Sequence, residues 1–301
     1  MEISLTAVSP SNVSVVIPAK NESASIGALV AAITRALPGA EILVVDDGSI
    51  DATGDIAANA GARVIHHPIS RGNGAAVKTG ARHASREILV FMDADGQHLP
   101  EEIPRLLQRL EHGYDMAVGA RGPGAHASLA RRLANAIYNT LASWITNTPI
   151  LDLTSGFRAV RADAFRQFLS LLPNGFSYPT TSTIAFLRAG LNVDFLPVQV
   201  LARHKDSSSH IRPLRDGARF FIIIFKVATL YSPLKVYLPM SLVFFASGVL
   251  YYSYTWFSSG RFTNLGALFF STAAVIFLIG LLSEQITTLM YLDSGRRKPN
   301  D

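Results

Sequence analysis

Two long stretches without a charged residue near the carboxyl end constrain the fold of this chain more than any other feature. Val236–Gly260 contains 25 such residues and Phe262–Ser283 contains 22. At about 1.5 Å of rise per residue, either stretch can cross a hydrocarbon core of about 30 Å as a helix. Only Arg261 separates them, which predicts a membrane hairpin with spans at about 236–258 and 262–284. Two buried helices of a soluble protein are the alternative, but both runs are long and uniformly apolar for that.

The charges are distributed unevenly along the chain. Residues 1–210 contain 18 basic and 18 acidic residues, whereas residues 211–301 contain 9 basic and 4 acidic ones. The basic surplus therefore lies beside the predicted spans, which argues for an anionic membrane surface and against a nucleic-acid partner. The chain has no cysteine, which excludes disulfides, thiolate metal sites and cysteine nucleophiles.

The basic residues around the two spans predict their orientation. Five precede the first span and three follow the second, whereas the connecting loop has only Arg261. The flanking residues are Arg212, Arg215, Arg219, Lys226, Lys235, Arg296, Arg297 and Lys298. The positive-inside rule then places both chain ends in the cytoplasm. We expect four parts: a cytoplasmic domain at 1–210, an amphipathic surface segment at 211–234, the hairpin at 235–290 and a basic tail at 291–301. No signal peptide is expected at the N-terminus.

Short apolar runs alternate with helical patterns in the first 120 residues. The runs lie at 13–19, 41–47, 62–67, 87–95 and 114–120, and the helical patterns at 23–36, 51–60, 74–84 and 100–111. This rhythm predicts an α/β domain with a mostly parallel sheet and helices on both faces. Ligands of such sheets bind at the carboxyl ends of the strands.

Acidic side chains follow three of the predicted strands. They are Glu22 after the first strand, Asp46 and Asp47 after the second, and Asp93 and Asp95 after the fourth. So many carboxylates at one edge need a cation or many hydrogen-bond donors. Asp93, Asp95 and Gln97 offer only oxygen ligands, which predicts Mg²⁺ or Mn²⁺. No P-loop and no GxGxxG motif follows the first strand, which argues against an ATPase and an NAD enzyme.

Five motifs in this order resemble a known enzyme family: VSVVIPAKNE, VVDDGS, RGNGAAVKTG, MDADGQH and LTSGFRAVR. The chain resembles the inverting family-two glycosyltransferases of the GT-A fold, and in particular the polyprenyl-phosphate glycosyltransferases, which include dolichol-phosphate mannosyltransferase and bacterial relatives with two C-terminal spans. The resemblance implies a Rossmann-like, mostly parallel sheet followed by a transmembrane hairpin.

The resemblance also implies roles for individual residues. Asp93, Asp95 and Gln97 match the metal-binding residues, and Asp95, Arg121 and Arg131 are the implied catalytic residues. Arg121, Arg131 and Asn135 are implied to hold the acceptor phosphate, with Asn135 where the family often has serine. The implied donor-binding residues are Pro18, Lys20, Glu22, Val45, Asp46, Asp47, Asp93, Ala94, Asp95 and Arg203.

A helix is also predicted from Ser128 to about Ile145. Leu129, Leu133, Ile137, Leu141 and Ile145 form its expected buried stripe, and Arg131, Asn135 and Asn139 form a polar one. We expect the polar stripe to contact an anionic acceptor, and a solvent-exposed helix face is the alternative. The histidines lack metal-ligand spacing and are expected in loops or at the surface, with His98 a candidate contact of the donor pyrophosphate.

The segment after LTSGFRAVR has no carboxylate between Asp163 and Asp194. A transferase that uses a hydroxyl acceptor needs a base there. We therefore expect Thr180–Thr183 to line the sugar pocket, and a polyprenyl phosphate to be the acceptor. The expected reaction transfers one sugar from a UDP- or GDP-sugar at the cytoplasmic membrane face. Transfer to a hydroxyl of a glycolipid and a non-catalytic membrane scaffold are the alternatives. Self-association into a homo-oligomer is left open.

The predicted orientation can be tested by cysteine labelling, because the chain has no cysteine of its own. A cysteine at Ser259, in the short loop, should react with an impermeant thiol reagent added to intact cells, and a cysteine at Ser294 should not. The opposite pattern would contradict the orientation.

Overall fold

The computed structural model describes residues 8–122, 129–175, 178–201, 229, 232–261 and 263–296, with only the backbone described at 129–134, 259 and 290–296. The described residues fall into two compact units, divided between residues 210 and 211. The predicted surface segment at 211–234 and the basic tail lie largely outside the described residues, as does Arg203.

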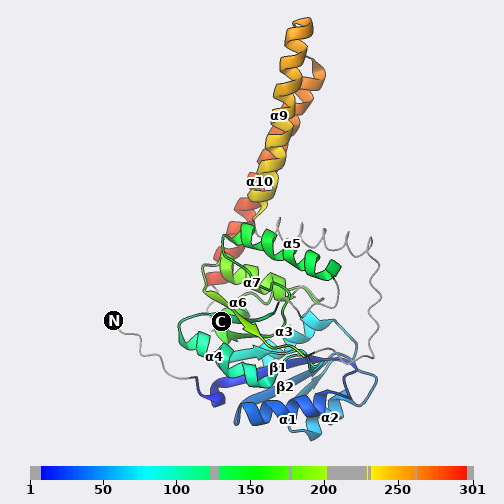
Figure 1. Ribbon diagram of the computed structural model, residues 1–301, viewed down its shortest axis with the longest axis vertical. Helices are drawn as coiled ribbons and strands as arrows, with labels where there is room; N and C mark the ends of the chain where they lie inside the picture. The colour runs from blue at the N-terminus through cyan, green and yellow to red at the C-terminus, as the bar shows by residue number, and fades with distance from the viewer. Residues whose placement is uncertain are drawn as a thin grey trace, which may run out of the picture. The chain divides into compact units, whose positions relative to one another are not determined.

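The first unit is built on one seven-stranded sheet (Figure 1). Its strands are β1 (Val13–Ala19), β2 (Glu41–Asp46), β3 (Arg63–His66), β4 (Ile88–Phe91), β5 (Met116–Arg121), β6 (Arg158–Arg161) and β7 (Val193–Val198). The spatial order is β3-β2-β1-β4-β6-β5-β7. β1 to β4 are mutually parallel, and so are β5 and β7, whereas β6 runs antiparallel to both of its neighbours. The predicted mostly parallel sheet is confirmed.

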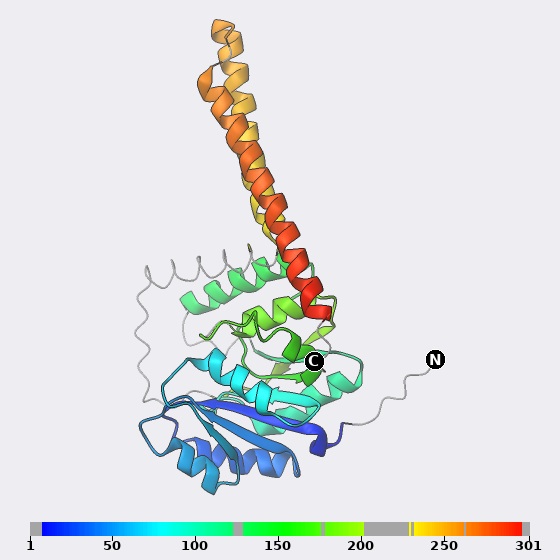
Figure 2. The ribbon, with the colours of Figure 1, turned by 180° about the vertical axis from the view of Figure 1, so that it is seen from behind.

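Helices cover both faces of this sheet, as Figures 1 and 2 show for α1 and α2 (blue) and α3 (cyan). The helices are α1 (Ile26–Ala36), α2 (Thr53–Asn59), α3 (Asn73–His83), α4 (Ile103–Glu111), α5 (Leu129–Thr146), α6 (Ala162–Gln167) and α7 (Tyr178–Arg188). Short 3₁₀ turns at Pro10–Asn12 and Pro100–Glu102 precede β1 and α4.

Each face of β1 is buried by a different set of helices, so the whole strand is inaccessible. Val13, Val15 and Ile17 share a core cluster with the apolar stripes of α1 and α4. On the other face α3 approaches closely at Gly80, where an added Cβ would lie 2.2 Å from Cγ1 of Val16. A larger residue there would push α3 off the sheet, and with it the loop that precedes α3.

Several described elements differ from the sequence-based expectation. β6 and β7 were not predicted, and β6 has only four residues with arginine at both ends. In α5 the predicted buried stripe is confirmed at Ile145 but is wrong at Ile137, which is 56% exposed. Among the described side chains of α5, Tyr138 and Ala142 are also buried, and Tyr138 lies about 100° around the helix axis from Ile137.

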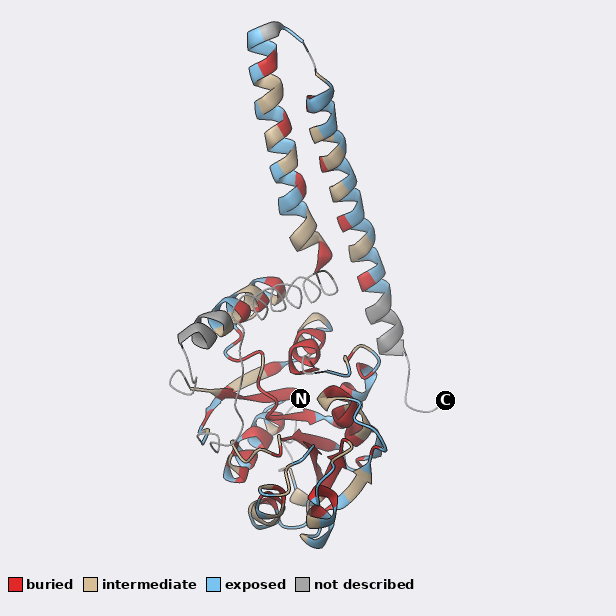
Figure 3. Ribbon diagram, turned by 90° about the vertical axis from the view of Figure 1, so that its right-hand side faces the viewer, coloured by how far each residue is buried: buried red, intermediate tan, exposed pale blue. Residues whose placement is uncertain are grey.

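The second unit is a helical hairpin of α9 (Pro233–Ser259) and α10 (Asn264–Arg296), which confirms the predicted layout. α9 ends at Gly260, whose left-handed conformation (φ 63°) closes the last turn through a bond from its N–H to the Trp256 carbonyl. Stretches of both helices, 233–258 and 264–289, are long and apolar enough to cross a membrane. Most of their surface is open rather than covered by protein (Figure 3).

Close contacts between the two helices set an antiparallel register. The Ser241 hydroxyl donates to the Ala273 carbonyl at 2.8 Å. Gly280 faces Tyr237, and an added Cβ would lie 2.6 Å from the Tyr237 Cβ. At the end of the hairpin opposite Gly260, the Leu234 N–H donates to Oε2 of Glu284 at 3.2 Å. Glu284 thus accepts one of the free N–H groups at the start of α9.

Candidate active site

The strand register brings the predicted donor-binding residues to one edge of the sheet. Ala19 pairs with Asp46, and Asp46 pairs with His66, so β1, β2 and β3 end side by side. Pro18, Val45 and Ala94 are buried at this edge, whereas Lys20 is exposed. These residues therefore lie where a donor is predicted to bind. For Pro18 and Val45, which are buried, a contact with the donor would involve the backbone more than the side chain.

The carboxylate of Asp47 is engaged in hydrogen bonds within the protein. Its carboxylate accepts hydrogen bonds from Nδ1 of His67 (2.7 Å), the Ser70 hydroxyl (2.7 Å) and the N–H groups of Arg71 and Gly72 (both 2.8 Å). Burial on its own would raise the pKa of Asp47, but these bonds lower it to about 2. Asp47 thus fixes the loop between β3 and α3, and its predicted contact with the nucleotide stays a prediction.

Glu22 links the end of β1 to the turn after β4. Its Oε2 accepts from the Ser25 hydroxyl at 3.1 Å, and the same hydroxyl lies 2.8 Å from the Ala94 carbonyl. Lys20 donates to Ser70 at 3.0 Å, which joins the β1 loop to the loop that Asp47 fixes. The three strand-end loops therefore support one another.

Asp93 and Asp95 follow β4 and lie close enough to influence each other's charge. Removal from water and the nearby Asp95 raise the pKa of Asp93 to about 6, against the effects of Asn73, Arg121 and Arg158. One oxygen of Asp95 accepts the backbone N–H of Gln97 at 3.1 Å, which shapes the Asp95–Gln97 turn. The carboxylates thus sit together at a cost in like-charge repulsion.

These groups fit a hard divalent cation. Asp93, Asp95 and Gln97 offer only oxygen ligands, and a cation would offset both the burial and the repulsion from Asp95 that raise the pKa of Asp93. No three His, Asp or Glu side chains gather as a metal cluster among the described residues. A cation here would therefore need oxygens from a substrate to complete its coordination.

Arg121, predicted as a phosphate ligand, is held by a carboxylate that sequence reasoning missed. Its Nε and Nη2 donate to the two oxygens of Asp152 at 2.8 and 3.0 Å, and Nη2 also reaches the Thr154 hydroxyl at 2.5 Å. Burial on its own would raise the pKa of Asp152, but Arg121 lowers it. Nη1 of Arg121 has no hydrogen-bond partner among the described residues, which leaves it for a ligand. Asp152 was detectable as the only charge between 133 and 157.

A second missed residue is Arg158, which is completely buried in β6. Its Nη1 donates to the Pro179 carbonyl (3.0 Å) and to the hydroxyls of Ser182 (2.7 Å) and Thr183 (3.1 Å), and Nη2 donates to the Ser155 carbonyl. The expectation that Thr180–Thr183 line a sugar pocket is therefore not met by Ser182 and Thr183, whose hydroxyls serve Arg158. The signal was the arginine of the LTSGFRAVR motif, which stands between apolar residues in the sequence.

Two histidines lie in loops, as expected, but are buried. His67 bridges Asp47 and the Thr79 hydroxyl, with Nε2 at 2.9 Å from the latter. His98 stacks on Phe157 with ring centroids 4.9 Å apart. Burial lowers the pKa of His98 to about 4, so its ring is neutral at pH 7. Its Nδ1 is buried and lacks a partner among the described residues.

The predicted acceptor residues on α5 are only partly described. The Arg131 side chain lies outside the described part, and Asn135 is partly exposed. Asn139 is engaged by its own fold: Nδ2 donates to the Leu151 carbonyl at 2.6 Å and Oδ1 accepts from the Leu153 N–H at 3.1 Å. Asn139 therefore anchors the 151–153 segment, and with it Asp152, to α5.

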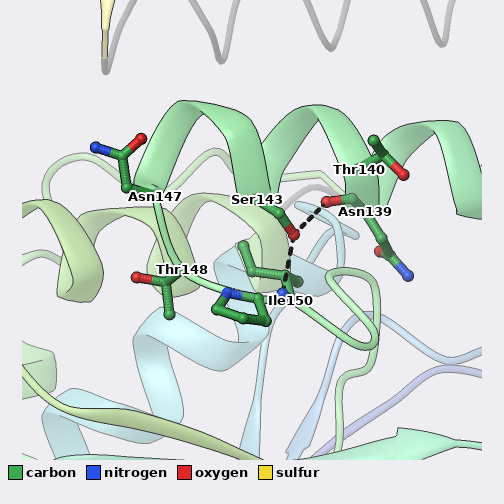
Figure 4. A pocket seen from close by; sticks show the side chains of 7 residues that line it. Asn139, Thr140, Ser143, Asn147, Thr148 and Ile150 are labelled. Atoms are coloured by element: carbon green, nitrogen blue, oxygen red, sulfur yellow. Dashed lines mark hydrogen bonds between the residues drawn. The ribbon is translucent and has the colours of Figure 1, made fainter.

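An open hollow of about 440 Å³ lies at the C-terminal end of α5 (Figure 4). It is lined by Asn139, Thr140, Ser143, Asn147, Thr148, Pro149 and Ile150. Ser143 holds the loop there, accepting from the Ile150 N–H at 2.9 Å and donating to the Asn139 carbonyl at 2.7 Å. Of the polar stripe predicted on α5, only Asn139 lines the hollow, and no lining residue is charged.

Comparison with known proteins decides the family. The model "Glycosyl transferase family 2" matches residues 14–169, more than half of the 301 residues, and the model "GtrB C-terminal hairpin" matches residues 232–289. The chain belongs to glycosyl transferase family 2. It is thus a glycosyltransferase with a GT-A fold, and the resemblance seen in its motifs is confirmed.

Several relatives of this family 2 enzyme span most of its length. The polyprenol monophosphomannose synthase of Mycolicibacterium smegmatis is 33% identical over 66% of this chain and 82% of its own. Glycosyltransferase AglJ of Haloferax volcanii is 28% identical over 83% and 86%. The undecaprenyl-phosphate mannosyltransferase of Micrococcus luteus is 30% identical over 64% and 85%.

The fold also matches a solved structure. Glucosyl-3-phosphoglycerate synthase from Mycobacterium tuberculosis, in complex with Mn²⁺ and UDP-glucose, is 26% identical with a TM-score of 0.57, over 72% of this chain and 78% of its own. Another structure of that protein holds Mg²⁺ and UDP, with 25% identity and a TM-score of 0.56, over 72% and 77%.

The four bonds to Asp47 predict an acid-dependent stability. Because its folded pKa of about 2 lies below the value of about 3.9 in an unfolded chain, Asp47 stabilises the fold above pH 4, and this contribution is lost as pH falls towards 2. Asp47→Asn should lower the free energy of unfolding at pH 7 by about 2 kcal/mol, a difference that shrinks below pH 4. Denaturant unfolding of the full chain in detergent, from pH 3 to 7, measures this.

Asp55→Asn is the matched control, since Asp55 is exposed on α2. It should leave stability nearly unchanged at every pH. A destabilisation by Asp47→Asn that is the same at pH 3 and pH 7 would show that the carboxylate charge is not what the four donors stabilise.

Proposed function

We propose that this enzyme transfers a single sugar from a nucleotide-diphosphate sugar, a UDP- or GDP-sugar, to a polyprenyl phosphate at the cytoplasmic membrane face, with inversion at the anomeric carbon. The observation that carries the proposal is the pairing of Asp152 with Arg121. Because of this pairing, Asp152, the one carboxylate in the segment directly before LTSGFRAVR, is not available as a general base. The pairing also holds the guanidinium of Arg121 at the site.

A phosphate acceptor suits a site without a free base. A phosphate monoester has its second pKa near about 6 and is already ionised at neutral pH, so it needs positioning rather than deprotonation. A hydroxyl acceptor needs a general base, whose pKa should lie near the working pH. Asp152 is a poor base, because its bonds to Arg121 lower its pKa. The names of the mycobacterial and Micrococcus relatives, a polyprenol monophosphomannose synthase and an undecaprenyl-phosphate mannosyltransferase, support the same acceptor class.

The surface of α5 supports an acceptor that lies in a membrane. Between residues 133 and 151 the chain has no charged side chain. Ile137, Trp144 and Leu151 are 56%, 49% and 54% exposed. An exposed apolar surface that includes tryptophan and lacks charge suits the interface between water and lipid. The hairpin would keep the enzyme at the bilayer, and the basic residues that flank it support a cytoplasmic catalytic domain.

On the donor side, Asp93, Asp95 and Gln97 would hold Mg²⁺ or Mn²⁺. A bound cation neutralises the charge that develops on the departing nucleoside diphosphate. Arg121 contributes through Nη1, which is free of partners among the described residues, while Asp152 fixes the plane of its guanidinium. Arg131, Asn135 and Arg203 are proposed as further phosphate ligands. The donor is proposed to lie along the strand ends, near Pro18, Lys20, Glu22, Val45, Asp46, Asp47 and Ala94.

The proposed acceptor can be tested with purified enzyme in detergent. UDP- and GDP-sugars are screened with undecaprenyl phosphate and, in parallel, with undecaprenol. Transfer should occur only to the phosphate, because Asp152 is paired with Arg121 and residues 164–193 contain no carboxylate that could deprotonate an alcohol. The product should release its sugar in mild acid. Transfer to undecaprenol at a comparable rate, or an acid-stable product, would favour a hydroxyl acceptor instead.

The metal role makes a separate prediction. Asp95→Ala should reduce transfer at least about 10²-fold, as other losses of preorganised charge stabilisation do. Chelation of divalent cations should abolish transfer, and Mg²⁺ or Mn²⁺ should restore it. Asp55→Ala removes an exposed carboxylate elsewhere and serves as the control. Full activity in excess chelator would remove the cation from the proposal.

A further inference from the structure

Asn21, in the loop after β1, has a left-handed backbone conformation that residues other than glycine rarely adopt, with φ at 55°. The loops that follow β2, β3 and β4 also contain a left-handed residue, which in each of them is a glycine: Gly48 (φ 69°), Gly72 (φ 99°) and Gly96 (φ 69°). Asparagine tolerates this conformation better than most residues, but glycine adopts it without a steric cost. The backbone conformation alone therefore does not explain why an asparagine follows β1.

The side chain of Asn21 joins the loop after β1 to the loop after β2. Its Oδ1 accepts the Ile50 N–H at 2.9 Å, and its own backbone N–H donates to the Ser49 hydroxyl at 3.0 Å. A glycine could keep the second bond but not the first. Helix capping is not the reason for the asparagine, because the Glu22 carbonyl accepts the Ile26 N–H at the start of α1 (3.0 Å).

Two more hydrogen bonds hold the same two loops together. The Glu22 N–H donates to the Thr53 hydroxyl at 2.8 Å, and the Ser23 N–H donates to Oδ2 of Asp51 at 3.3 Å. β1 and β2 are parallel neighbours, so both loops leave the sheet at its carboxyl edge. Residues 21–23 and 49–53 therefore form one connected unit at this edge.

The residues on either side of the left-handed position contact the other two loops of this edge. On one side, Lys20 donates to Ser70 in the loop after β3, at 3.0 Å. On the other side, the Glu22 carboxylate accepts from the Ser25 hydroxyl, which also lies 2.8 Å from the Ala94 carbonyl in the turn after β4. The direction of the chain at position 21 thus sets how these two loops are placed relative to each other.

We propose that Asn21 is a positioning residue for the nucleoside diphosphate part of the donor. The proposed donor site extends along the strand ends to the metal turn after β4, and Asn21 lies between the two residues that connect these loops. Backbone strain that surrounding hydrogen bonds hold in place is typical of ligand sites. The Oδ1 bond to Ile50 keeps the strained turn in the conformation that the nucleotide needs. This inference rests on the donor class of the proposed function.

The test compares Asn21→Gly with the matched control Asn147→Gly in the full chain in detergent. Asn147, in the loop after α5, has a φ of 56°, so the control makes the same substitution at the same backbone conformation. Binding of UDP and of GDP is measured by isothermal titration calorimetry in a buffer with Mn²⁺. Thermal unfolding midpoints are measured without nucleotide.

Asn21→Gly should weaken binding of the nucleotide that the wild type binds by about 3- to 10-fold, the range that corresponds to one neutral hydrogen bond. Its unfolding midpoint should not fall below that of Asn147→Gly, since glycine relieves the same strain at both positions. Asn147→Gly should bind the nucleotide as the wild type does. Asn21→Ala, which loses the Oδ1 bond and keeps the strain, should bind more weakly than Asn21→Gly.

Three results would overturn the inference while leaving the proposed function intact. They are wild-type nucleotide affinity in Asn21→Gly, an equal loss of affinity in Asn147→Gly, and an unfolding midpoint of Asn21→Gly well below that of Asn147→Gly, which would make Asn21 a residue of the fold. A wild-type chain that binds neither UDP nor GDP would instead overturn the proposed donor class, and this inference with it.

Discussion

Like-charge repulsion at the carboxyl edge of the sheet is the constraint around which the catalytic unit is organised. Asp46 and Asp47 lie at the end of β2, and Asp93 and Asp95 follow β4, the two strands on either side of β1. Asp47 is offset by four hydrogen bonds from one loop, which lower its pKa to about 2. Asp93 is not fully offset, and its pKa rises to about 6. Asp47 thus serves the fold, whereas Asp93 is proposed to bind a cation.

The two arginines nearest this edge follow the same division. Arg121 is held by Asp152, and its Nη1 has no hydrogen-bond partner among the described residues. Arg158 is completely buried and bound by carbonyls and hydroxyls, with no salt bridge to a carboxylate among the described residues. Its charge acts on Asp93 through the protein interior. Arg121 is therefore positioned to contact a ligand, whereas Arg158 contributes positive charge to the electrostatic environment of Asp93.

The sequence predicted the parts of this molecule that repeat a simple pattern. The hairpin, the first five strands and the strand-end carboxylates were predictable, because hydrophobic periodicity and the βαβ rhythm are local signals. β6 was not, because its pairing between β4 and β5 is long-range and its sequence is rich in arginine. Asp152 was missed for a related reason: its importance lies in the side chain that it meets, Arg121, and spacing along the chain does not show that pairing. The stripe on α5 failed at Ile137 because an apolar residue can face lipid as well as protein core.

The exposed apolar side chains of the uncharged stretch 133–151 have a practical consequence for handling this enzyme. Membrane proteins of this layout are often shortened by removing their spans, on the assumption that the remaining domain behaves like an ordinary soluble protein. Here Ile137, Trp144 and Leu151 would stay exposed after such a deletion. Exposed apolar side chains in water favour self-association or adsorption to a hydrophobic phase. We therefore expect the catalytic domain to retain an affinity for detergent after the two helices are removed.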